Sequence, residues 1–353
     1  MTSPADLAGA RVLVTSGLGF IGSNVAHRCV ALGATVTICD TLDPRCGGNP
    51  ANLAGIADRV RSIAVDIRDA DATAPLVGES DLIFNCAAFT SHAQSMKDPH
   101  HVMSVNCDGV IALLEAVRRS GRSIRVVHVG TSTQIGRMIV EPATETHPEF
   151  PLDMYSASKT AAEKVLLVQA EAHGIPATAV RLANVYGPRA NIRSADLGFL
   201  NYFIGRALRG EDLTVYGAGD QLRNVTYVDD VVDALIRVAG SGRCSGEVIF
   251  AVSPEHLTVR ELAERVATEL GGVGVRSVPW PVERRVIEVG HQVLSADKAK
   301  ELLGWTATTG LRPAAGEAGE ESSPSVTVAL VLVVIVIVIV LGRARAHDLA
   351  ARV

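Results

Sequence analysis

The sequence lacks the patterns that mark disulfide-stapled, metal-binding and nucleic-acid-binding proteins. Its six cysteines are scattered, with no CxxC pair: Cys29, Cys39, Cys46, Cys86, Cys107 and Cys244. This spacing indicates reduced thiols in a cytosolic protein. No block of lysine and arginine occurs, and the net charge is -5, which argues against a nucleic-acid partner. There is no HExxH motif, so we interpret His92, His100, His101 and His147 as surface loop residues and expect no metal.

The two ends of the chain differ sharply in composition. The first ten residues, MTSPADLAGA, have no basic or apolar region of the kind found in signal peptides, so we expect a cytoplasmic protein. Near the other end, a polar linker at 313–325 precedes an apolar run at 326–341. A membrane helix is one interpretation of this run. Its length, about 24 Å as a helix against about 30 Å of hydrocarbon, argues against a span. So do its β-branched composition and the arginines that follow it. An aggregation-prone appendix and a reading-frame artefact are the alternatives.

Short β-branched runs alternate with helical patterns through the first half of the chain. Predicted strands cover 11–15, 35–40, 60–66, 81–86, 125–130 and 177–182, and predicted helices cover 21–32, 102–120 and 155–173. This alternation predicts an α/β fold with a doubly wound parallel sheet (Rossmann). We assign 8–182 to that domain, with a returning segment at about 225–252. A smaller substrate-binding domain is predicted from 183–224 and 253–312, and the two would enclose a cleft at the carboxyl ends of the strands.

A glycine-rich turn follows the first predicted strand. The stretch VTSGLGFIGSN holds Gly17, Gly19 and Gly22 as GxGxxG, directly before a predicted helix. Glycines permit a tight turn and let backbone amides approach a pyrophosphate, which the positive helix N-terminus also attracts. The pattern therefore predicts dinucleotide binding. A glycine turn in an unrelated α/β protein is the alternative.

Two acidic residues follow the next two strands. Asp40 ends TVTICD, 18 residues after Gly22. A carboxylate there accepts hydrogen bonds from both ribose hydroxyls and repels a 2′-phosphate, which favours NAD over NADP. The nearby Arg45 weakens that preference slightly. Asp66 follows the third strand and could bind the adenine amino group or simply cap a turn.

Tyr155 and Lys159 form a YxxxK pattern in MYSASKTAAEK. Residues at i and i+4 share one face of a helix, so an ammonium beside the phenol would lower the tyrosine pKa. Tyr155 is then a candidate general base for a sugar hydroxyl, and Lys159 could also reach the nicotinamide ribose. Thr131, Ser132 and Thr133 place further hydroxyls at the end of the fifth strand.

Taken together, these motifs resemble those of the NAD-dependent nucleotide-sugar epimerases and dehydratases, which are extended short-chain dehydrogenases/reductases. The motifs that carry the resemblance are GLGFIGS, the Asp40 strand end, Val65-Asp66-Ile67, FNCAA (84–88), Asn106, YSASK, RLANVYGPR (181–189) and LRNVTYVDD (222–230). The chain departs from the family pattern at Ser16, where a glycine is usual, and in the tail after Arg312. At Ser16 we expect looser cofactor binding rather than its loss, if the turn requires a positive φ.

The resemblance implies a role for individual residues. Thr131 would be the catalytic hydroxyl beside Tyr155 and Lys159, and Asn184 and Arg223 would hold the substrate pyrophosphate. The residues implied at the cofactor are Gly17, Gly19, Phe20, Ile21, Gly22, Asp40, Asp66, Ile67, Ala87, Ala88, Tyr155 and Lys159. The resemblance also implies a homodimer formed through the helices at 102–120 and 155–173.

Several reactions are open to such a site. We expect epimerisation of a nucleotide-diphosphate sugar, by oxidation of a hydroxyl, commonly at C4, to a ketone and return of the hydride to the other face. A 4,6-dehydratase needs further acid-base groups, usually an Asp-Glu pair after the catalytic threonine, and Ser132 and Thr133 stand at those positions. A nucleotide-uronate decarboxylase remains an alternative. A scaffold protein that binds NAD without catalysis is another, although Tyr155, Lys159 and Thr131 argue against it.

Overall fold

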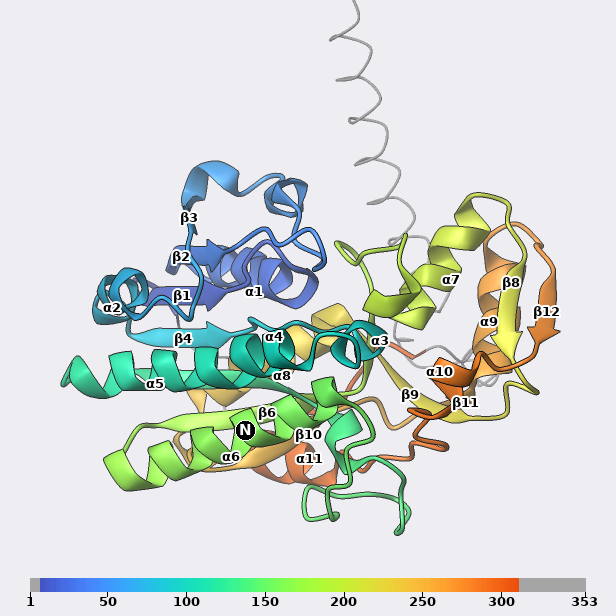
Figure 1. Ribbon diagram of the computed structural model, residues 1–353. Coiled ribbons are helices and arrows are strands. Elements are labelled where there is room, and N and C mark those ends of the chain that lie inside the picture. Colours follow the sequence, from blue (N-terminus) through green and yellow to red (C-terminus); the bar gives the residue numbers. More distant parts are fainter. Residues whose placement is uncertain (1–6, 311–353) are drawn as a thin grey trace, which may run out of the picture.

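A seven-stranded parallel sheet forms the centre of the molecule (Figure 1). The computed structural model describes residues 7–310. The strand order is β10-β6-β5-β4-β1-β2-β3, and every pairing is parallel. The bounds are β1 Arg11–Thr15, β2 Thr35–Asp40, β3 Val60–Ala64, β4 Leu82–Asn85, β5 Arg125–Thr131, β6 Ala177–Leu182 and β10 Val248–Ala251. The chain reverses its direction of winding between β1 and β4. A ligand crevice opens at such a switch point in an open α/β sheet.

Helices cover both faces of this sheet. On one face pack α1 (Phe20–Ala31), α8 (Val228–Gly240) and α11 (Asp297–Leu303), and on the other α2 (Ala70–Gly78), α5 (Gly109–Arg119) and α6 (Met154–His173). Alternate residues of one strand serve the two cores: Val12 and Val14 of β1 face α1 and α8, and Leu13 between them faces α2 and α5. Because both faces are covered, β1 is apolar from Val12 to Val14.

A smaller lobe stands beside the carboxyl ends of the central strands (Figure 1). Its strands are β7 (Asn184–Tyr186), β8 (Leu213–Tyr216), β9 (Leu222–Tyr227), β11 (His256–Thr258) and β12 (Val275–Val278). Its helices are α7 (Phe199–Leu208), α9 (Val259–Glu269) and the short α10 (Val282–Arg285). Strands β11, β9 and β7 form one sheet, and β12 pairs with β8. This lobe has its own apolar core, which includes Phe203, Val215 and Leu262. The exact division of the chain into two domains stays a prediction.

The predicted helix at 102–120 differs in the structure from a regular α-helix. It consists of α4 (Pro99–Met103), a π-helical turn at Ser104–Asp108, and α5. Asn106 lies in the π turn and is fully buried. Its side chain accepts from the Phe89 amide at 2.7 Å and donates to the Phe89 carbonyl at 3.1 Å and to Ser158 Oγ at 2.9 Å. The widened turn thus places a side-chain amide that ties the loop after β4, with its short helix α3 (His92–Ser95), to α6.

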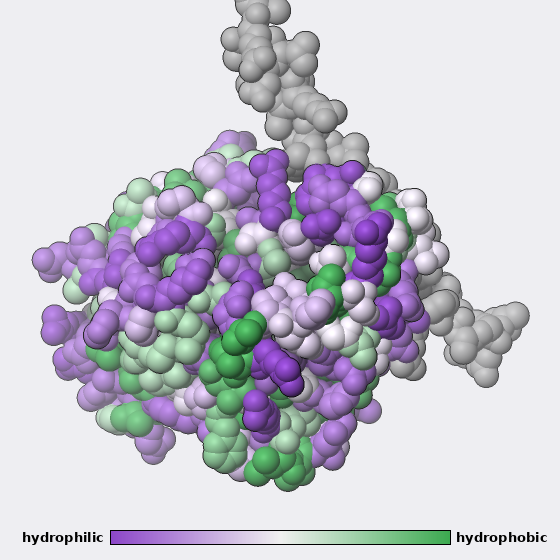
Figure 2. All heavy atoms as spheres, turned by 45° about the vertical axis from the view of Figure 1, so that its right-hand side comes forward, coloured by the Kyte–Doolittle hydropathy of each residue, from purple (hydrophilic) through white to green (hydrophobic). Residues whose placement is uncertain are grey.

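The predicted apolar run at 326–341 and the linker at 313–325 lie outside the described residues. Within 7–310, no helix combines the length and the apolar character needed to cross a membrane. Hydrophilic residues cover much of the face shown in Figure 2, with smaller groups of hydrophobic residues between them.

Candidate active site

A cavity of about 480 Å³ lies between the central sheet and the smaller lobe. It collects most of the residues predicted to bind cofactor or substrate: Gly19, Phe20, Ile21, Gly22, Ala88, Thr131, Tyr155, Lys159, Asn184 and Arg223. Five predicted residues do not line it: Gly17, Asp40, Asp66, Ile67 and Ala87. Gly17 and Ala87 lie behind its wall, against Ile38 and Thr15 respectively. Asp40 and Asp66 lie at the ends of β2 and β3, farther along the same edge of the sheet.

The turn between β1 and α1 is packed too closely for side chains. A Cβ on Gly22 would lie 2.3 Å from the Ser16 carbonyl oxygen, and one on Gly17 would lie 2.4 Å from Ile38 Cβ. Ser16 adopts a φ of 51°. This is the left-handed region, which favours the glycine that usually stands at this position. No side chain caps the N-terminus of α1. The backbone amides and the dipole of this helix therefore fit a dinucleotide pyrophosphate.

Asp40 fastens the phosphate turn to the second strand. One of its oxygens accepts from the Leu18 amide at 3.1 Å, and the other accepts from the Leu42 amide at 2.8 Å. The side chain is buried, yet a carboxylate has about four acceptor positions, so two bonds leave room for ribose hydroxyls. The neighbouring Arg45 pairs with Asp43 at 2.8 Å and lies over the Phe89 ring. Its charge is thus compensated, which weakens its ability to attract a 2′-phosphate.

Asp66 also has a cationic partner. Arg68 binds its carboxylate with a shortest distance of 2.5 Å, and this hydrogen bond lowers the pKa of Asp66. Ile67 is buried and packs where a side chain on Gly109 would otherwise stand. The adenine role of Asp66 and Ile67 stays a prediction.

The first turn of α6 carries the two predicted catalytic side chains. The helix begins at Met154 because Asp153 caps it, accepting from the Ser156 amide at 2.7 Å. Tyr155 and Lys159 both line the cavity, as their spacing predicted. The Lys159 ammonium, however, donates to the Val129 carbonyl at 2.6 Å and lies 3.1 Å from His128 Nε2.

The expected lowering of the tyrosine pKa by Lys159 is wrong for this structure. Burial raises the pKa of Tyr155 to about 12, and a hydrogen bond with Thr131 opposes this only in part. Burial lowers the pKa of Lys159 to about 8. The i, i+4 spacing brings the two residues to one helix face, but the flexible lysine side chain reaches into the sheet and binds a carbonyl there instead.

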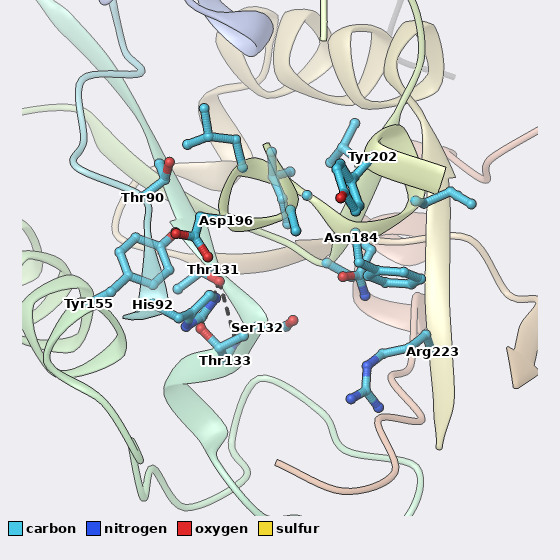
Figure 3. Close-up of a pocket in the computed structure, with 18 of the residues that line it drawn as sticks. Thr90, His92, Thr131, Ser132, Thr133, Tyr155, Asn184, Asp196, Tyr202 and Arg223 are labelled. Carbon is cyan, nitrogen blue, oxygen red and sulfur yellow. Dashed lines mark hydrogen bonds between the residues drawn. The ribbon is translucent and has the colours of Figure 1, made fainter. Parts of the chain in front are cut away.

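A row of hydroxyls runs from the end of β5 toward α6 (Figure 3). Thr131 Oγ1 lies 3.0 Å from Thr133 Oγ1, which accepts from Ser156 Oγ at 2.8 Å. The neighbouring Thr131 hydroxyl also opposes the rise of the Tyr155 pKa. The hydroxyls that the sequence placed at the end of the fifth strand therefore lie beside the phenol. No carboxylate stands at the two positions that follow Thr131.

The structure brings two further residues to the phenol that sequence reasoning missed. His92, at the start of α3, lines the cavity, and its ring meets the Tyr155 ring edge-on with centroids 4.8 Å apart. Its Nδ1 lies 2.7 Å from the Asp153 carboxylate. The interpretation as a surface loop residue is thus wrong for His92, which lies in a helix and lines the cavity, and for His147, which is buried. The pairing joins positions 61 residues apart, and no local motif signals it.

Long side chains that are already paired form the wall on the lobe side. Asn184 donates to the Asn224 carbonyl at 3.2 Å. Arg223 binds Glu288 at 2.5 Å and donates to the Gly290 carbonyl at 2.5 Å. A second pair joins Arg284 of α10 to Asp196, in a short turn at 195–197. Both arginines line the cavity, and each is held by a carboxylate.

The described part of the chain offers no metal centre. Within residues 7–310, no group of three or more His, Cys, Asp or Glu side chains is arranged to hold a metal ion.

The chain belongs to the NAD-dependent epimerase/dehydratase family, whose model matches residues 12–249. The cofactor of this family is NAD, and the phosphate turn described above fits it. A UDP-glucose 4-epimerase of Mycolicibacterium smegmatis is 32% identical over 299 residues, 84% of this chain and 93% of that protein. A dTDP-glucose 4,6-dehydratase of the same organism is 35% identical over 237 residues, 66% of this chain and 69% of that protein.

Solved structures show the same fold. A UDP-glucose 4-epimerase of Thermotoga maritima, solved with UDP-glucose, has a TM-score of 0.79 and 28% identity, covering 93% of this chain and 98% of that one. A UDP-glucose 4-epimerase of Thermus thermophilus, solved with NAD, has a TM-score of 0.77 and 29% identity, covering 91% and 98%. The relatives act on nucleotide sugars but catalyse different reactions, so the family alone does not select one.

Proposed function

We propose that this enzyme epimerises a nucleotide-diphosphate sugar by transient oxidation at C4. One observation carries the proposal: Tyr155, Thr131 and the phosphate turn line one cavity, and the positions after Thr131 hold Ser132 and Thr133 instead of carboxylates. Elimination of water across C5 and C6 requires a base for the C5 proton and, in addition, a separate acid for the departing C6 hydroxyl. Serine and threonine hydroxyls do not ionise near neutral pH.

In this proposal Tyr155 and Thr131 bind the oxygen that is oxidised. Tyr155 exchanges a proton with that oxygen, and Thr131 holds it through a hydrogen bond. A phenol with a pKa near 12 is set to donate to a keto oxygen in the return step. NAD, when bound, would supply the hydride acceptor. Gly19, Phe20, Ile21 and Gly22 would hold its pyrophosphate, and Lys159 its nicotinamide ribose.

Asn184 and Arg223 would bind the substrate diphosphate on the lobe side. The guanidinium fork of Arg223 suits two phosphate oxygens, but Glu288 occupies it in the structure. Substrate binding in this account exchanges a protein carboxylate for a phosphate oxygen. This exchange reduces the net gain of binding, because the broken ion pair is worth about as much as an ordinary charge-assisted bond.

The alternatives are a 4,6-dehydratase, a uronate decarboxylase and an NAD-binding scaffold without activity. A panel assay separates them: the full-length protein is incubated with UDP-, dTDP-, GDP- and CDP-linked hexoses and uronic acids, and products are resolved by mass and by proton NMR. Unchanged mass with inverted stereochemistry at C4 supports the proposal. Loss of water or of carbon dioxide assigns the dehydratase or the decarboxylase, and no conversion of any sugar supports the scaffold.

We further propose a cytoplasmic homodimer formed through α5 and α6. Ile111 on α5 is 38% exposed and Val168 on α6 is 66% exposed, so both helices present an apolar side chain to solvent in the single chain. Burial of such side chains between two copies is favourable. Light scattering of the purified protein tests this, with twice the chain mass as the expected result.

A further inference from the structure

His92 is an acid-base group that lines the cavity directly beside Tyr155. It lies at the start of α3, and its side chain is 36% exposed, toward a cavity that Tyr155, Thr131 and Thr133 also line. Figure 3 shows the imidazole beside the Tyr155 ring. The imidazole and the phenol therefore line the same cavity, with their ring centroids 4.8 Å apart.

A buried carboxylate fixes the orientation of this imidazole. The Asp153 side chain is 1% exposed and lies 2.7 Å from His92 Nδ1. Burial opposes ionisation of Asp153, but hydrogen bonds from His92 and from Ser156 outweigh it and lower the pKa of this carboxyl group. A carboxylate only accepts hydrogen bonds, so Nδ1 carries the hydrogen and Nε2 is the basic nitrogen. The edge-on contact with Tyr155 limits rotation of the ring.

We propose that His92 is a second catalytic base, which removes a proton from the carbon next to a C4 ketone of the nucleotide sugar. The inference rests on the proposed function, because oxidation at C4 creates that ketone. A ketone acidifies the hydrogens on its neighbouring carbons, C3 and C5. An imidazole held by a carboxylate is the group that commonly accepts such a proton.

The step balances without any further reactant. His92 Nε2 takes the proton from C3 or C5, and the electron pair of that C–H bond forms a carbon–carbon double bond to C4. The C4 carbonyl electrons move onto its oxygen, which Tyr155 and Thr131 hold by hydrogen bonds. Return of a proton from His92 restores the ketone. Because an imidazolium exchanges its hydrogen with water, the carbon acquires a solvent hydrogen in the process.

The contacts of His92 would suit either a structural role, in which it holds α3 against α6, or a catalytic role, and this reaction distinguishes the two. A histidine that only holds α3 against α6 leaves the carbon–hydrogen bonds of the sugar untouched. A pure C4 epimerase also leaves them untouched, since the hydride leaves and returns at C4 alone. Exchange of hydrogen at C3 or C5 with solvent therefore reports on the proposed base and on nothing else in the account.

The test supplies the ketone directly, so that it does not depend on the oxidation step. Full-length protein is mixed in D₂O with UDP- and dTDP-linked 4-keto-6-deoxyglucose, and deuterium at C3 and C5 is followed by NMR against a blank without protein. We expect the wild-type protein to accelerate exchange and His92→Gln to reduce the acceleration about 10²-fold or more. His100→Gln, the same substitution at an exposed histidine of α4, is the matched control and should exchange at the wild-type rate.

Asp153→Asn adds a readout that a structural role would not move. Asparagine caps a helix as well as aspartate does, so α6 should begin unchanged and circular dichroism should match the wild type. The carboxylate that orients His92 is lost, and exchange should fall about tenfold or more.

The outcomes for the two proposals are distinct. Exchange in the wild type no faster than in the blank, or equal exchange in wild type and His92→Gln, overturns the inference. If sugar alcohols are interconverted but ketones do not exchange, the epimerase proposal stands and the role of His92 falls. If ketones exchange through His92 but no sugar alcohol is converted, the role of His92 stands and the epimerase proposal falls.

Discussion

The two walls of the cavity are built in different ways. The sheet side is made from backbone: a turn too tight for a Cβ at Gly22, a helix N-terminus without a side-chain cap, and the end of β5, which carries Thr131. The lobe side is made from long charged side chains, Arg223 with Glu288 and Arg284 with Asp196. The sheet side is therefore a rigid wall, because its shape is set by the backbone. The lobe side is an adaptable wall, because its arginines must exchange a carboxylate for a phosphate to bind a diphosphate.

The largest effect is expected at the phenol, where the two walls meet. Tyr155→Phe removes one oxygen and keeps the ring against His92. We expect turnover to fall about 10²–10⁴-fold because the proton acceptor is lost. NAD content after purification should change little, since the phosphate turn is untouched. Turnover within tenfold of the wild type would contradict a tyrosine-based mechanism.

The rigid wall can be broken by adding a single methyl group. Gly22→Ala places a Cβ 2.3 Å from the Ser16 carbonyl oxygen, so the turn must move. Overpacking of this kind costs about 1–3 kcal/mol, which corresponds to about 5–150-fold weaker NAD binding by calorimetry. Gly78→Ala is the matched control, because its Cβ meets nothing within 4 Å. Equal NAD affinity in both variants would show that the turn adapts.

The buried ammonium of Lys159, in the rigid wall, should lower the free energy of unfolding of the protein. Burial lowers its pKa from 10.5 in the unfolded chain to about 8 when folded. Between these values the unfolded state binds more protons, so the penalty is full below pH 8 and is relieved as pH rises toward 10.5. We expect Lys159→Met to raise the free energy of unfolding by about 1–3 kcal/mol at pH 7 and by less at pH 10. The same variant should lose turnover. A gain that grows with pH would contradict this sign.

The adaptable wall responds to the removal of a competing carboxylate. Glu288→Gln leaves the Arg223 charge without its partner, so a substrate diphosphate no longer displaces a carboxylate. We expect the KM for the nucleotide sugar to fall about two- to fivefold with kcat little changed. Arg223→Gln is the opposing variant and should raise KM about tenfold. A rise in KM for Glu288→Gln would mean that the glutamate orients the arginine rather than competing for it.

The smallest effect is expected at Ser16, in the phosphate turn. Its φ of 51° costs about 1–2 kcal/mol for a residue with a Cβ, and glycine would remove this cost. Glycine also has more conformational freedom in the unfolded chain, which offsets part of the gain in stability. Ser16→Gly should therefore raise the free energy of unfolding by about 0.5–1 kcal/mol, measured by thermal or denaturant melting. A lower stability would show that the hydroxyl makes a contact worth more than the strain.

The sheet side could be predicted from the sequence because its signals are local. The strands, the glycine turn and the Tyr155–Lys159 helix each occupy a short segment whose residues meet within one or two turns of chain. The lobe-side pairs and the His92–Asp153 pair join positions 65, 88 and 61 residues apart, so they exist only after the fold forms. The prediction that the Lys159 ammonium lies beside the phenol was wrong for a related reason. The spacing fixes the position of a Cβ, but the flexible side chain determines where the ammonium lies.

The central claim is that a hydride leaves C4 of a nucleotide sugar and returns to the same carbon. A substrate with deuterium at C4 tests it most directly, with the product examined by mass and NMR. The account predicts an epimer of unchanged mass that still carries deuterium at C4. A product that has lost water or carbon dioxide, or an epimer with hydrogen at C4, would contradict it.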